Sequence, residues 1–160
     1  MSARDNFTPD EWKSLLKTPM LVGYAVAGAA PSKQEEFVRE MAAVAEGIIE
    51  GGRNVQKDSL VGAVIADIVA NADDEQRGQT ERLSLQEVGT RALDTCRAVA
   101  ALLETKASPA EAYEYKRWVL KVAENVAAAA KEGGFFGYGG EQISGSEVAT
   151  INDIGEAIRI

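Results

Sequence analysis

The longest helical pattern of this 160-residue sequence begins at Ser108 and constrains the fold more than any other feature. Ser108 and Glu111 have the spacing of a capping box, and Pro109 occupies the first helical position, where its missing N–H costs nothing. Apolar residues then recur at steps of three and four, which traces one stripe along a helix. The stripe consists of Ala112, Tyr115, Val119, Val122, Ala123, Val126 and Ala130. Because the glycines at 133–134 are suited to ending a helix, the pattern predicts a central packing helix over 108–131.

Further helix starts carry the same signals. Capping-box spacings occur at Thr8–Glu11, Ser32–Glu35 and Ser84–Glu87, and Thr18-Pro19 repeats the cap-then-proline signal inside the N-terminal segment. We expect the other helices over 9–17, 18–30, 32–50, 59–72, 84–106 and 144–158. No segment shows sustained two-residue alternation, so we expect no strand outside the loops. The sequence therefore predicts an all-α single domain of six or seven helices.

Composition limits the partners and the location of the protein. The net charge of −8 argues against nucleic acid or an anionic membrane surface as a partner, because both require a basic surface. The longest early apolar run, Met20–Ala30, is far shorter than the roughly 20 residues that cross a bilayer. Acidic residues precede this run and prolines flank it, which is not typical of a signal peptide. We therefore expect a cytoplasmic protein that does not associate with membranes.

The sequence contains no histidine and one cysteine, Cys96. The lack of histidine removes the usual general base near neutral pH, the Ser–His and Cys–His nucleophile pairs and the common zinc ligand sets. Cys96 lies within an amphipathic helical pattern, which favours a buried small side chain over a reactive thiol. We expect no cofactor and no metal. A site for a hard cation is possible only if the fold brings the carboxylates of Asp67 and Asp153 close together.

The two halves of the sequence resemble each other. Pro31, Glu36 and Arg39 correspond to Pro109, Glu114 and Arg117 at one constant offset, and Asp67 corresponds to Asp153 at a second offset. These matches predict a duplicated three-helix unit, about 18–72 and 84–160, with the equivalent helices packed around a pseudo-twofold axis. The segment 73–83 between the copies is polar and lacks apolar periodicity, so we expect an exposed linker there.

The repeated pairs Glu36/Arg39 and Glu114/Arg117 are candidate ligand or partner residues. Residues three apart on a helix are close enough for an ion pair, and such a pair on a solvated face is the simpler interpretation. The alternative is that these groups are partly buried where the two copies meet, where they would fix the register or bind a small ligand.

A second candidate surface is the glycine-aromatic segment 133–140, GGFFGYGG. It lacks the Gly-Lys-Ser/Thr ending of a phosphate-binding loop. Phe135, Phe136 and Tyr138 either close the end of the core or form a ligand or partner surface built on aromatic anchors.

This loop, the segment EQISGSEVATINDIGEAI after it and TPDEWKSLLKTPMLVGYAVAGAAPS near the N-terminus resemble a family of small all-helical bacterial hypothetical proteins. In that family a glycine-aromatic loop also precedes an acid-rich helix start, which Phe135, Phe136, Tyr138, Ser144 and Glu147 match here. The resemblance implies a stand-alone bacterial cytoplasmic domain. It implies no activity, cofactor or catalytic residue.

We therefore expect a non-catalytic interaction or assembly protein that binds a protein partner or self-associates. No catalytic residue can be identified from the sequence. The alternative is a small-molecule-binding protein or a carboxylate-based enzyme, using Glu36, Glu114, Asp67 or Asp153 in a cavity between the helical halves.

Overall fold

The computed structural model describes residues 3–29, 34–78, 85–132 and 145–160, with side chains over 3–29, 42–71, 87–128 and 145–160. A short 3-10 helix η1 (Ala3–Asn6) is followed by six α-helices: α1 (Pro9–Ala27), α2 (Gln34–Gly51), α3 (Leu60–Gly78), α4 (Leu85–Lys106), α5 (Pro109–Glu132) and α6 (Gly145–Ile158). None of the described segments forms a strand. The prediction of an all-α single domain with six or seven helices is confirmed.

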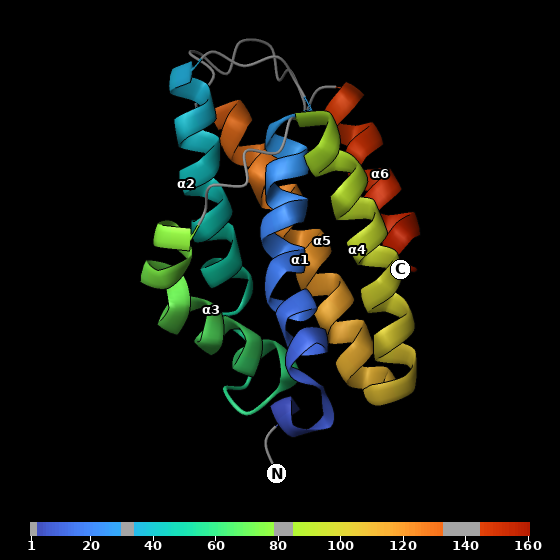
Figure 1. Ribbon diagram of the computed structural model, residues 1–160. Coiled ribbons are helices and arrows are strands. Elements are labelled where there is room, and N and C mark those ends of the chain that lie inside the picture. The colour runs from blue at the N-terminus through green and yellow to red at the C-terminus, as the bar shows by residue number, and fades with distance from the viewer. Residues whose placement is uncertain (1–2, 30–33, 79–84, 133–144) are drawn as a thin grey trace.

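Helices α1 and α5 occupy the centre of the molecule (Figure 1). Helices α2 and α3 lie on one flank of this pair, and α4 and α6 lie on the other. The main packing contacts join α1 to α4 and α5, α2 to α5, and α4 to α6. The main hydrophobic core includes residues of all six helices, and a small second cluster joins Ala25 of α1 to Val88 and Ala92 of α4.

Helix α5 forms as its sequence predicts. The Ser108 amide donates to Glu111 Oε2 at 2.9 Å, and the Glu111 amide donates to Ser108 Oγ at 3.2 Å, which completes the capping box. Every stripe residue whose side chain is described is buried: Ala112, Tyr115, Val119, Val122, Ala123 and Val126. Helix α1 is as deeply buried as α5, from Trp12 to Ala27. The centre of the fold is thus a pair of helices, and not α5 alone as expected.

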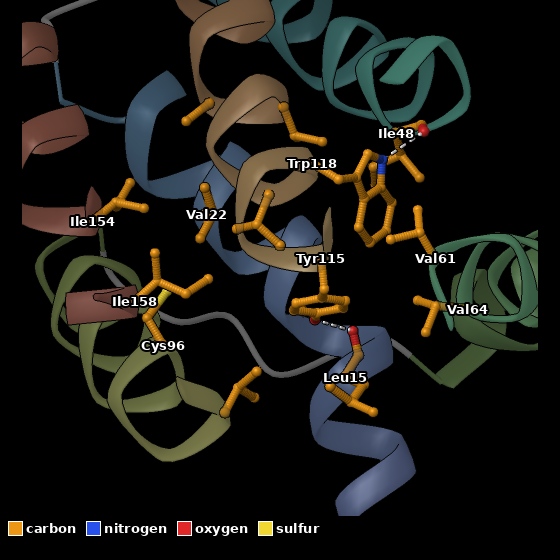
Figure 2. Packing of buried hydrophobic residues seen from close by; sticks show 14 of the residues in the cluster. Leu15, Val22, Ile48, Val61, Val64, Cys96, Tyr115, Trp118, Ile154 and Ile158 are labelled. Atoms are coloured by element: carbon orange, nitrogen blue, oxygen red, sulfur yellow. Dashed lines mark hydrogen bonds between the residues drawn. The ribbon is translucent and has the colours of Figure 1, made fainter. Parts of the chain in front are cut away.

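The expectation of two helices separated at Pro19 is wrong, because α1 continues from Pro9 through Pro19 to Ala27. Proline has no N–H and cannot donate to the carbonyl four residues earlier, which here belongs to Leu15. The Tyr115 hydroxyl donates to this carbonyl oxygen at 2.7 Å (Figure 2). Burial raises the pKa of Tyr115, so the hydroxyl keeps its proton and remains a donor. Packing against α5 thus supplies the partner that the helix itself lacks.

A second hydrogen bond from α5 lies at the end of helix α2. The Gly52 amide donates to the Ile49 carbonyl at 3.1 Å. The Trp118 indole Nε1 donates to the neighbouring Ile48 carbonyl at 3.2 Å (Figure 2). Such side-chain donors satisfy the carbonyls that the last turn of a helix leaves without a backbone partner. The contact requires glycine at position 51, where a β-carbon would lie 2.7 Å from Trp118 Cδ1.

Helix α3 is longer than predicted. It begins after Ser59, whose hydroxyl accepts the Gly62 amide at 3.1 Å, and it continues to Gly78 instead of ending at Ala72. Residues 73–78 of the expected linker are therefore helical, whereas 79–83 lie outside the described residues. The physical reason is that Glu, Gln and Arg are good helix formers, and extending an existing helix costs far less than starting one.

Cys96 is fully buried in the core, as predicted, and burial raises the pKa of its thiol to about 12.

The predicted duplication of a three-helix unit stays a prediction. A strict twofold axis between the two halves would exchange α1 with α4 and α2 with α5. Under that symmetry, the contact between α1 and α5 would have an equivalent contact between α4 and α2. Helices α1 and α5 pack closely, but α2 and α4 are not among the principal contact pairs of the described residues.

Candidate functional site

Several predicted site residues lie where the structure gives no side-chain positions. Glu36 and Arg39 are on α2, but their side chains are outside the described set. Phe135, Phe136 and Tyr138 lie outside the described residues altogether. The proposed roles of these five residues therefore stay predictions.

Glu114 and Arg117 lie on α5. Glu114 is partly buried and Arg117 is exposed. No ion pair joins them, although their spacing permits one. Because the Arg117 side chain reaches solvent, it is not enclosed between packed helices.

Asp67 and Asp153 do not form a shared cation site. Asp67 Oδ2 accepts a 2.7 Å hydrogen bond from Trp12 Nε1 and lies 3.4 Å from Arg4 Nη1. Asp67 thereby joins α3 to η1 and to the start of α1. Asp153 is exposed on α6, on the opposite flank of the molecule (Figure 1). Among the residues that the structure describes, no group of three or more His, Cys, Asp or Glu side chains could hold a metal ion.

Helices α2 and α3 each expose one large aliphatic side chain. Ile49 on α2 is 52% exposed, and Val69 on α3 is 56% exposed. Ile65 Cδ1 packs against Gly52, which follows Ile49 by three residues, and Val69 follows Ile65 by one helical turn. We call Ile49, Ile65 and Val69 the α2–α3 face. An ion pair of 3.1 Å between Arg53 Nε and Glu50 Oε2 lies at its edge.

A depression of about 530 Å³ opens between α4 and α6, on the other flank. Its lining residues are Leu93, Arg97, Asp153, Glu156, Ala157 and Arg159. Of these, sequence reasoning had singled out Asp153 alone. The other lining residues could not be identified from the sequence. Isolated charged residues on two separate helices are typical of solvent-exposed faces, and only the packing of α4 against α6 brings them into one depression.

The arginines of the α4–α6 depression are held by carboxylates. Arg97 Nη1 donates to Asp94 Oδ1 at 3.0 Å. Arg159 Nη1 donates to both oxygens of Glu104, at 2.7 and 2.8 Å. The Arg159 hydrogen bond is the main reason that the pKa of Glu104 is lowered. These pairs restrict where the two guanidinium groups can lie.

The backbone also fixes Arg159. Its φ of 63° is left-handed, its amide donates to the Glu156 carbonyl, and the Ile160 amide donates to the Gly155 carbonyl at 3.1 Å. This is the Schellman motif that ends many helices, with arginine where glycine is usual. Lys116 of α5, which is mostly buried, reaches the Arg159 carbonyl at 3.5 Å and complements the negative end of α6.

Over the residues that the structure describes, the protein is an all-α domain of six α-helices, with the α2–α3 face on one flank and the α4–α6 depression on the other. Comparisons with known protein families, with curated proteins and with solved structures found no match. Over the described segments, no helix combines the length and hydrophobicity that spanning a membrane requires.

Proposed function

We propose that this protein is a non-catalytic interaction and assembly protein, and that it self-associates through the α2–α3 face. The observation that carries the proposal is the exposure of Ile49 on α2 and Val69 on α3, at 52% and 56%, where Ile65 of α3 packs against the end of α2 at Gly52. Burial of exposed aliphatic side chains against a partner is favourable, at about 25 cal/mol per Å² of apolar area removed from water.

A second copy of the chain is the partner that this surface suits. In a twofold dimer the same patch lies on both sides of the interface, so Ile49 and Val69 of one copy would cover the same residues of the other. The edge of the face carries both signs of charge, on Glu50 and Arg53. Such an edge is complementary to itself across a twofold axis, which favours the correct register.

Sedimentation equilibrium of three proteins over a range of concentrations tests the proposal. The wild type should form an oligomer, and Ile49→Glu combined with Val69→Glu should be monomeric, because glutamate maintains the helices but opposes burial. Val148→Glu is the matched control, since Val148 is 43% exposed on α6, on the opposite flank. A wild type that is monomeric at every concentration, or a double variant with unchanged mass and native circular dichroism, would contradict the proposal.

The proposal includes a cytoplasmic location in a bacterium. The resemblance of the sequence to small bacterial helical proteins supports this location. Fractionation of source cells, with the protein traced by an antibody, would test it, and recovery in the membrane or extracellular fraction would contradict it.

A further inference from the structure

We propose that the α4–α6 depression binds a zwitterionic small molecule of the α-amino acid class. This inference is independent of the proposed self-association, because the depression and the α2–α3 face lie on opposite flanks (Figure 1). It rests on the size of the depression, its apolar floor and the presence of both signs of charge.

The depression has the dimensions and the floor that a small ligand needs. Its volume of about 530 Å³ falls within the roughly 300–1,000 Å³ that is usual for small-molecule sites. Leu93 of α4 is partly buried and Ala157 of α6 is buried, so the floor between the helices is apolar. An apolar ligand side chain could cover this floor.

Two arginines that line the depression supply hydrogen-bond donors. Arg97 and Arg159 each use Nη1 to bind Asp94 and Glu104, respectively. Within the described part of the chain, their Nε and Nη2 groups make no other hydrogen bond. These donors can bind a ligand carboxylate, and an arginine already held in place loses less side-chain entropy when it does so.

Two carboxylates supply the opposite charge. Asp153 and Glu156 lie three residues apart on α6, and both line the depression. Their side chains form no ion pair or hydrogen bond with the described residues. They can therefore accept hydrogen bonds from a ligand ammonium group.

The combination of charges selects the class of ligand. The carboxylates of Asp153 and Glu156 would repel a simple anion such as phosphate. A calcium or magnesium ion would need more oxygen ligands than two side chains supply, and Arg97 and Arg159 would repel it. A molecule with one carboxylate and one ammonium group satisfies both pairs of side chains together.

Isothermal titration calorimetry with L-leucine, L-glutamate and L-lysine tests the inference. We expect saturable binding that is tightest for leucine, because the floor is apolar. Removing one ligand charge should weaken binding at least about tenfold, since it leaves charged protein groups unpaired. N-acetyl-L-leucine lacks the ammonium charge, and L-leucinamide lacks the carboxylate.

Substitutions on the protein complete the test. Arg97→Gln and Asp153→Asn should each weaken leucine binding severalfold without changing the melting temperature, because both side chains are exposed. Arg117→Gln, which replaces an exposed arginine on α5, is the control and should bind as the wild type does. The inference is overturned if none of the three amino acids binds, if both blocked leucines bind as well as leucine, or if neither substitution weakens binding. Unchanged leucine binding by the Ile49→Glu, Val69→Glu variant would support a site independent of self-association.

Discussion

The Tyr115 hydroxyl donates a 2.7 Å hydrogen bond to the Leu15 carbonyl, the acceptor that Pro19 leaves without its usual helical donor. The two bonded residues are 100 positions apart in the sequence. Tyr115 is fully buried, so no water can replace it at that carbonyl. We therefore expect the proline in α1 and the tyrosine in α5 to be energetically coupled.

Replacing Tyr115 by phenylalanine should lower the free energy of unfolding by about 1–3 kcal/mol, because a buried carbonyl loses its partner. Tyr113→Phe is the control, since Tyr113 lies on the same helix and is 61% exposed. Its effect should stay within about 0.5 kcal/mol. Urea unfolding of both variants measures the difference.

In a Pro19→Ala background the Tyr115→Phe substitution should cost less, by about 1 kcal/mol, because alanine restores an N–H for the Leu15 carbonyl. A double-mutant cycle measures this coupling. An equal cost in both backgrounds would show that Pro19 and Tyr115 are not linked in this way.

Glycine-to-alanine substitutions should divide into two groups. Gly89 on α4 and Gly155 on α6 have no atom within 4 Å of an added β-carbon, so alanine there should stabilise the protein by roughly 0.5–1 kcal/mol. At Gly51 the β-carbon would lie 2.7 Å from Trp118, and at Gly23 it would lie 2.7 Å from Val44. Alanine at these two positions should destabilise by about 1–3 kcal/mol. Thermal melts measure the effect. A change of the melting temperature in the same direction for all four variants would refute the packing described for α1, α2 and α5.

Arg159 offers a test of backbone strain. Its φ of 63° is unfavourable for any side chain with a β-carbon. Arg159→Gly and Arg159→Ala both remove the ion pair with Glu104, so the difference between them isolates the backbone. Glycine avoids the strain of the left-handed backbone, but it also increases the conformational entropy of the unfolded chain, which offsets part of the gain. The net result should be a glycine variant that is more stable than the alanine variant by about 0.5–1 kcal/mol. Equal midpoints in urea would argue against a left-handed residue at this position.

The Glu11 carboxylate should make stability depend on acid pH. Its hydrogen bond from Lys106, with a further one from the Thr8 amide, lowers the pKa of Glu11 below its ordinary value of 4.5. The stabilisation is therefore complete above pH 4.5 and is lost as the pH falls through the lowered pKa. The difference in stability between wild type and Glu11→Gln should shrink over that acidic range.

Glu111→Gln is the matched control for Glu11→Gln, because Glu111 forms the same capping box on α5 without a lysine partner. Urea midpoints between neutral pH and pH 3 provide the measurement. A gap between wild type and Glu11→Gln that stays constant over the whole range would exclude the Lys106 interaction as its cause.

Local signals predicted much of the fold. The capping boxes at Thr8 and Ser108, the buried stripe of α5 and the burial of Cys96 all depend on residues within a few positions of one another. The continuity of α1 through Pro19 was not predictable in the same way, because its cause is a hydroxyl 100 residues away. The extension of α3 was missed because a polar segment at the end of a helix has no apolar stripe to mark it.

The candidate sites were harder to predict from the sequence than the fold. The spacing of Glu114 and Arg117 permits an ion pair, but Arg117 is exposed, and the entropy lost in holding two long side chains together near solvent cancels most of the gain. The α4–α6 depression depends on how two helices meet, and the sequence of each one alone shows only scattered charges.

The hydrogen bonds that α5 makes to Leu15 and Ile48 have a consequence for biosynthesis. They span 100 and 70 residues, and α5 leaves the ribosome after α1 and α2. Until then, the middle of α1 and the end of α2 lack a donor for a carbonyl that the native fold buries. The nascent chain should therefore stay protease-sensitive until Tyr115 and Trp118 have emerged, and a fragment ending at Lys106 should show much less helix by circular dichroism than its share of the native protein. A protease-resistant, fully helical fragment would mean that the first four helices fold without α5.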